Sequence, residues 1–98
     1  MFSNYDILII EDEKVVIDSA KKILIPEGFK VDDTFSVDKA LQKLKQNKYK
    51  LILTDLMLPK ISGIELTEIV TQKYPDIPII IITGYATLEN AVQSLKVG

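Results

Sequence analysis

The chain has 98 residues, of which 47% are hydrophobic, so it can bury one modest core and form a single domain. Twelve basic and 14 acidic residues give a net charge of -2, which is too balanced to indicate a nucleic-acid groove or an anionic membrane surface. Cysteine and histidine are absent, which excludes disulfides, thiolate metal sites and imidazole catalysis. No long apolar run opens the chain, and we expect a cytoplasmic protein without a membrane segment.

The first half of the chain predicts two pairs of strand and helix. Ile7–Ile10 is a continuous β-branched and aliphatic run, typical of a parallel strand covered on both faces. The apolar residues then follow a helical period until Pro26 and Gly28 end the helix. Residues 29–35 suit an edge strand, and Ser36 offers an N-cap for a second helix. The apolar faces expected of these helices are Val15, Val16, Ser19, Ala20, Ile23 and Leu24, and Val37, Ala40, Leu41 and Leu44.

The second half repeats the pattern twice. Residues 51–54 and 79–82 are two further buried-strand runs, and the first is followed by a helix that closes at Tyr74 and Pro75. Thr87 can cap a last helix. The apolar residues of these two helices are Ile64, Leu66, Ile69 and Val70, and Leu88, Ala91, Val92 and Leu95. Four such units with short connections predict an α/β fold with an open parallel sheet and helices on both faces.

Ligands of an open parallel sheet bind beyond the carboxyl ends of its strands, so the residues that follow each run are the candidates for a site. Taken singly, each acid found there can instead be a helix cap. Taken together, converging carboxylates repel one another and raise each other's pKa, and a bound cation usually offsets this cost. The residues in question are Glu11, Asp12 and Glu13 after the first run, Thr54 and Asp55 at the third, and Thr83 and Gly84 after the fourth.

The ligands available to a cation at this edge are all oxygens, which favours hard ions such as Mg²⁺, Mn²⁺ or Ca²⁺. Calcium generally needs a dedicated loop of the D-x-[DN]-x-[DN]-G type, which the sequence lacks. Magnesium tolerates few carboxylates together with waters and phosphate oxygens. We therefore expect Mg²⁺, with Mn²⁺ as an alternative, and chemistry on phosphate.

Three motifs in this order resemble the receiver domain of bacterial two-component response regulators: IIEDE at residues 9–13, LTDLMLP at 53–59 with Gly63, and ITG at 82–84. The resemblance implies a flavodoxin-like fold with strand order 2-1-3-4-5. It also implies that Asp55 is the nucleophile that forms an aspartyl phosphate. Asp12 would bind the metal directly and Glu11 through a water.

The remaining site residues implied by the resemblance lie in two loops. Asp55 itself and the backbone carbonyl of Met57 would complete the protein ligands of the metal. The Thr83 hydroxyl would contact the phosphoryl group and act as the switch, while Gly84 would offer its backbone N–H. The phosphoryl donor would be a sensor histidine kinase or a phosphotransfer protein. The signal would reach the surface around helix four, the predicted helix that Thr87 caps, and an output domain beyond this chain.

The sequence departs from the family pattern at its end. It stops at Gly98, where a fifth strand and helix would follow, so we expect residues 1–98 to form a receiver domain with four of the five usual units. The family lysine after the fifth strand has no counterpart, and Lys60 is no substitute. An alternative function is therefore a phosphorylation-impaired receiver that acts only as an interaction or dimerisation scaffold. Strand 79–82 would be an uncovered edge, which predicts a homodimer through this strand or a swapped helix four.

Two enzymatic or ligand-binding alternatives fit the sequence less well. A haloacid-dehalogenase-like phosphohydrolase would place a second aspartate two residues after the first, where this chain has Met57. A flavin or nucleotide domain of similar topology would need a glycine-rich or hydroxyl-rich loop after the first strand, where Glu11 and Asp12 would repel phosphate. We expect a signalling phosphoacceptor, with at most slow self-hydrolysis, rather than a metabolic enzyme.

Overall fold

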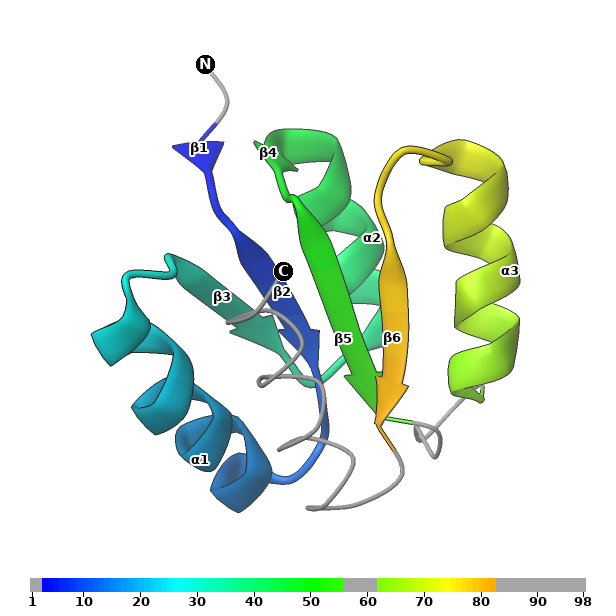
Figure 1. Ribbon diagram of the computed structural model, residues 1–98. Coiled ribbons are helices and arrows are strands. Elements are labelled where there is room, and N and C mark those ends of the chain that lie inside the picture. Colours follow the sequence, from blue (N-terminus) through cyan, green and yellow to red (C-terminus); the bar gives the residue numbers. More distant parts are fainter. Residues whose placement is uncertain (1–2, 56–61, 83–98) are drawn as a thin grey trace.

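A computed structural model describes residues 3–55 and 62–82, which form a parallel sheet with helices on both faces (Figure 1). The four main strands are β2 (Ile7–Ile10), β3 (Val31–Thr34), β5 (Leu51–Asp55) and β6 (Ile79–Ile82). They lie in the order β3-β2-β5-β6, and every pair is parallel. The predicted α/β class is confirmed, and among the described strands the order agrees with that of the receiver resemblance.

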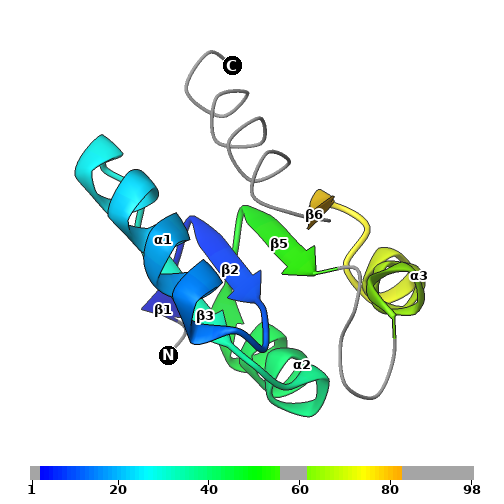
Figure 2. The same ribbon diagram turned by 90° about the horizontal axis from the view of Figure 1, so that it is seen from below.

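The helices lie on opposite faces of the sheet, as Figure 2 shows. Helix α1 (Lys14–Leu24) covers one face and is followed by a 3-10 turn, η1 (Ile25–Glu27). Helices α2 (Val37–Gln46) and α3 (Gly63–Lys73) cover the other face. The helix predicted from Thr87 lies outside the described residues. None of the described helices is long and apolar enough to cross a bilayer.

Strand β2 is central and is buried along its whole length, which explains its unbroken apolar sequence. Successive side chains alternate between the two faces, so each face receives every second residue. Ile7, Ile9, Leu51 and Leu53 pack with Ile17, Ala20 and Leu24 of α1. Leu8, Ile10 and Ile52 pack with Ala40 and Leu44 of α2 and with Leu66 and Val70 of α3.

The helix termini follow the local sequence. Ser36 is the N-cap of α2, as predicted, and its side chain accepts a hydrogen bond from the backbone N–H of Lys39 at 3.3 Å. Ser62 caps α3 in the same way but was not predicted. After η1, Gly28 adopts a left-handed conformation with φ of 95°, which glycine reaches without strain.

Two details of the predicted helix faces were wrong. Val15 was expected in the core, but its side chain is 72% exposed, and Ile17 is buried in its place. Ile64 was likewise expected to be buried and is 54% exposed, whereas Leu66 is fully buried. In both helices the exposed residue precedes the buried one by two positions, and at 3.6 residues per turn this puts the two on nearly opposite sides.

A second, two-stranded parallel sheet was also not predicted. It pairs β1 (Ser3–Asn4) with β4 (Asn47–Lys48), directly before the central strands β2 and β5. The backbone continues this pairing, because the N–H of Tyr5 donates to the carbonyl of Lys48 at 2.8 Å. The small sheet therefore ties the amino ends of β2 and β5 together.

Candidate metal centre

Three carboxylates meet at the carboxyl edge of the sheet. Glu11 and Asp12 directly follow β2, and Asp55 is the last residue of the neighbouring strand β5. One carboxylate oxygen from each residue can be chosen so that all three lie within 4.8 Å of one another. The parallel register explains this convergence, because Ile10 pairs with Thr54, and the next residue of each segment, Glu11 or Asp55, therefore lies at the same level of the sheet edge.

Glu11 is the buried member of this acidic cluster, with only 4% of its surface exposed. Its Oε1 accepts hydrogen bonds from the backbone N–H groups of Asp12 at 3.0 Å and Glu13 at 3.2 Å. Burial is the main cause that raises the pKa of Glu11 to about 7; the bond from Glu13 opposes this rise, and the nearby Asp12 and Asp55 add to it. Without a cation, the site therefore holds a carboxyl group that ionises reluctantly.

The other two acids are more accessible than Glu11. Asp12 is exposed and Asp55 is half-buried, so their carboxylates can be reached from solvent. The residue before Asp55, Thr54, is fully buried, and its hydroxyl donates to the backbone carbonyl of Asp55 at 3.2 Å. This arrangement combines one fixed, buried oxygen ligand with two accessible ones.

The acidic cluster fits a hard divalent cation. A cation would offset the repulsion among three carboxylates and favour the ionised form of Glu11. Two exposed or half-buried acids leave room for waters and phosphate oxygens, which Mg²⁺ commonly retains in its coordination shell. The donor set and its accessibility therefore suit magnesium.

Sequence reasoning named Glu11, Asp12 and Asp55 for this site, and the structure brings these three together. Three other named residues, Met57, Thr83 and Gly84, lie outside the described residues, as does the loop residue Pro59. Two features were missed: the unequal burial of the acids, and the backbone N–H groups that hold Glu11. No signal in the sequence distinguishes Glu11 from Asp12 in this respect.

An open parallel sheet with an acidic cluster at its carboxyl edge defines a class of α/β domain suited to metal-assisted phosphate chemistry. The chain belongs to the response regulator receiver domain family, whose family model matches residues 7–98. It is accordingly a receiver domain of two-component signalling.

Three relatives illustrate the similarity. The nitrogen assimilation regulatory protein NtrX of Azorhizobium caulinodans is 31% identical over 96 residues, which are 96% of this chain and 21% of that protein. A response regulator receiver domain protein of Methanospirillum hungatei has 37% identity and a TM-score of 0.75, covering 100% of this chain and 77% of that one. The response regulator TrrA of Thermotoga maritima, solved with Mg²⁺ and BeF, has 29% identity and a TM-score of 0.75, covering 96% and 80%. The chain thus spans about a fifth of the length of NtrX.

Proposed function

We propose that this chain is the phosphoacceptor domain of a response regulator and that Asp55 receives the phosphoryl group. The observation that carries this proposal is the position of the Asp55 carboxylate at the sheet edge, beside Glu11 and Asp12. Asp55 is half-buried, so it can meet a donor while the sheet fixes its backbone.

The proposed reaction is a phosphoryl transfer between two proteins. A carboxylate oxygen of Asp55 attacks the phosphorus of a phosphohistidine on a sensor kinase or phosphotransfer protein. The new phosphorus–oxygen bond forms as the phosphorus–nitrogen bond breaks, and the electron pair of that bond leaves with the imidazole. The product is an aspartyl phosphate on Asp55.

Glu11, Asp12, Asp55 and the backbone carbonyl of Met57 would hold Mg²⁺, for which Mn²⁺ could substitute. When bound, the ion supplies positive charge that offsets the charge of the transferring phosphoryl group. The proposal is supported by the all-oxygen donor set and by TrrA, a relative solved with Mg²⁺ and BeF. The backbone N–H groups of Asp12 and Glu13 keep the buried carboxyl of Glu11 in place for this task.

The signal would leave the site through Thr83 and Gly84, which follow strand β6. We propose that the Thr83 hydroxyl and the Gly84 N–H contact the phosphoryl group. The last described residue before them, Ile82, is the register partner of Asp55, which supports their placement near the acceptor. The surface around helix four would then change and act on an output domain of the full-length cytoplasmic regulator.

Intact-mass spectrometry after incubation with acetyl phosphate and Mg²⁺ tests this function. The expected result is the gain of one phosphoryl group that disappears without Mg²⁺ and in Asp55→Asn. Asp18→Asn is the matched control, because it removes an exposed aspartate of α1 that pairs with Lys14 instead of lying in the acidic cluster. The absence of a gain in the parent chain would favour the scaffold alternative over phosphoacceptance.

We also propose that the chain forms a homodimer. Within the described residues, β6 pairs with β5 alone, and Ile79, Ile80 and Ile81 are half-buried. We propose association through this strand or through exchange of helix four. Light scattering coupled to size-exclusion chromatography should give twice the chain mass at high concentration, and a monomer throughout would contradict the proposal.

A further inference from the structure

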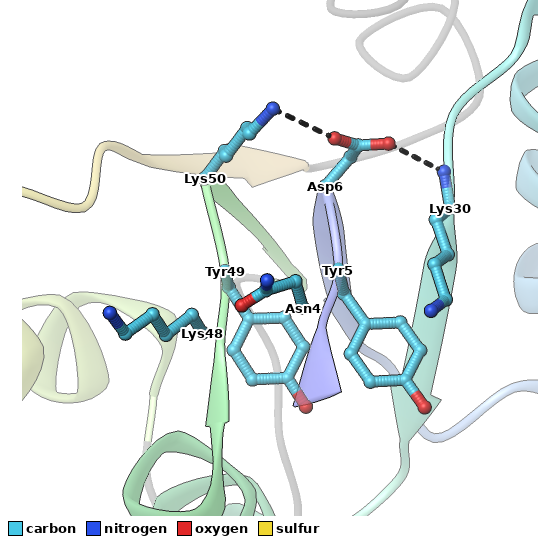
Figure 3. A pocket seen from close by; sticks show the side chains of 7 residues that line it. All are labelled: Asn4, Tyr5, Asp6, Lys30, Lys48, Tyr49 and Lys50. Atoms are coloured by element: carbon cyan, nitrogen blue, oxygen red, sulfur yellow. Dashed lines mark hydrogen bonds and ion pairs between the residues drawn. The ribbon is translucent and has the colours of Figure 1, made fainter. Parts of the chain in front are cut away.

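A hollow of about 460 Å³ lies at the amino edge of the sheet (Figure 3). The acidic cluster lies at the other ends of the same strands. Its walls come from three segments, each of which directly precedes a strand of the main sheet. The segments contribute Tyr5 and Asp6 before β2, Lys30 before β3, and Lys48, Tyr49 and Lys50 before β5. The hollow is therefore built by the same parallel topology as the acidic cluster, but with the opposite charge.

The single carboxylate of the hollow is already neutralised. Oδ2 of Asp6 accepts the backbone N–H of Lys30 at 2.7 Å, and Oδ1 lies 3.3 Å from Nζ of Lys50. The bond from the Lys30 backbone is the main cause that lowers the pKa of Asp6, and the charges of Lys50 and Lys30 lower it further. Asp6 thus stays ionised and neutralises the charge of Lys50. The dashed lines in Figure 3 mark its contacts with Lys30 and Lys50.

The three lysines and one carboxylate of the lining leave the hollow with a net charge of +2. No described carboxylate lies within ion-pair distance of Lys30 or Lys48. These two lysines flank the hollow on opposite sides in Figure 3, and the Lys30 ammonium lies 5.1 Å from the centre of the Tyr5 ring. Long lysine stems can turn both ammonium groups toward a ligand between them. A ligand with two negative charges would balance the net charge of this hollow.

The aromatic wall of the hollow is fixed before any ligand arrives. The rings of Tyr5 and Tyr49 stack with 5.5 Å between centroids and 16° between planes. The Tyr49 hydroxyl donates to Asp32 at 2.6 Å, and burial keeps the pKa of this phenol above its usual range, so it remains a donor. A rigid wall lowers the entropic cost of binding the organic part of a ligand.

We propose that this hollow is a second ligand site that binds a small phosphate monoester. The two charges of the phosphate would pair with Lys30 and Lys48, and the organic group would lie against the tyrosine wall. The volume lies within the range of about 300–1,000 Å³ that small-molecule sites occupy. The proposal is independent of phosphorylation at Asp55, because no residue is shared with the acidic cluster.

The test is an NMR titration with phenyl phosphate in the absence of divalent metal. At about pH 8 the probe is a dianion, because its second pKa is about 6. Saturable shifts are expected at Tyr5, Lys30 and Lys48, with inorganic phosphate and succinate binding more weakly. Lys30→Gln/Lys48→Gln should lower the affinity for phenyl phosphate by at least about tenfold, which is the effect of losing one charge-assisted hydrogen bond.

A matched control separates a site from general attraction to positive charge. Lys22→Gln/Lys39→Gln removes the same charge from two exposed lysines outside the hollow and should leave the affinity unchanged. Equal weakening by both double variants, or equally tight binding of succinate, would overturn the proposal. If the glutamine variant unfolds, Lys30→Arg/Lys48→Arg decides, because it keeps both charges and should retain binding.

Discussion

Ile10 and Thr54 are register partners on neighbouring parallel strands, and the residues that follow them are Glu11 and Asp55. The first of these carboxyls is buried and bonded to two backbone N–H groups, whereas the second is half-buried. The sheet thus sets two acids of unequal character side by side. This inequality makes the metal-free site sensitive to pH.

Glu11→Gln should flatten the pH dependence of stability. The pKa of Glu11 is raised from 4.5 to about 7, so the folded state holds this proton more tightly than the unfolded chain. Binding of this proton contributes on the order of 3 kcal/mol to the free energy of unfolding. The contribution is complete below about pH 4.5 and is lost as the pH rises through about 7. Urea unfolding in EDTA across this range measures it; a wild-type slope retained in Glu11→Gln would contradict the assignment.

Mg²⁺ should stabilise the folded chain, and removing an acid should weaken this effect. Asp12→Asn and Asp55→Asn each remove the negative charge of one candidate metal ligand. We therefore expect the affinity for Mg²⁺ to fall by at least about tenfold, or about 1.4 kcal/mol. Thermal unfolding at increasing Mg²⁺ gives the affinity, because a ligand of the folded state raises Tm. Asp18→Asn should behave like the parent chain, and the same loss in that variant would indicate a nonspecific salt effect.

Tyr49→Phe should destabilise the fold by about 1–2 kcal/mol, because it removes a hydrogen bond to a half-buried carboxylate. The Tyr49 hydroxyl lies 2.6 Å from Asp32 Oδ2, and Lys43 lies 3.2 Å from both oxygens of that carboxylate. The phenylalanine ring keeps the stacking with Tyr5. Tyr74→Phe is the control, since no described hydrogen bond involves its hydroxyl. Equal urea midpoints for the two variants would refute the assigned role of Asp32.

Ile17→Ala and Val15→Ala should differ strongly in stability. Ile17 is 8% exposed and packs between α1 and the sheet, so its truncation should cost about 2–4 kcal/mol. Val15 is 72% exposed, and its truncation should change the free energy of unfolding by about 0.5 kcal/mol or less. Chemical denaturation of both variants measures the difference. A larger loss of stability in Val15→Ala than in Ile17→Ala would mean that Val15 faces the core, as the sequence pattern predicts.

The strands could be predicted from the sequence because central parallel strands are apolar on both faces. The runs at 7–10, 51–54 and 79–82 carry this signature, and the parallel order then places Glu11, Asp12 and Asp55 at one edge. The rotation of α1 and α3 could not be predicted in the same way. Apolar residues occur on more than one side of each helix, so the pattern alone leaves two rotations with similar burial.

Features built from several loops also escaped prediction. The small sheet of β1 and β4 has only two residues in each strand, too few for a periodic signal. The hollow at the amino edge joins Lys30 to Lys48 across the sheet, and lysines in separate loops look like an ordinary solvated surface in sequence. Its positive charge appears only when the fold brings the segments together.

Strand β2 also raises the question of what sets its register. All four of its residues are buried and apolar, so a slip by one position would exchange one aliphatic side chain for another on each face. The charged residues at its two ends do distinguish the positions. Asp6 is held by Lys30 and Lys50 at one end, and Glu11 by two backbone N–H groups at the other. A slip in either direction would pull one of these carboxylates into the sheet, so the two acids act as stops that define the alignment of the central strand.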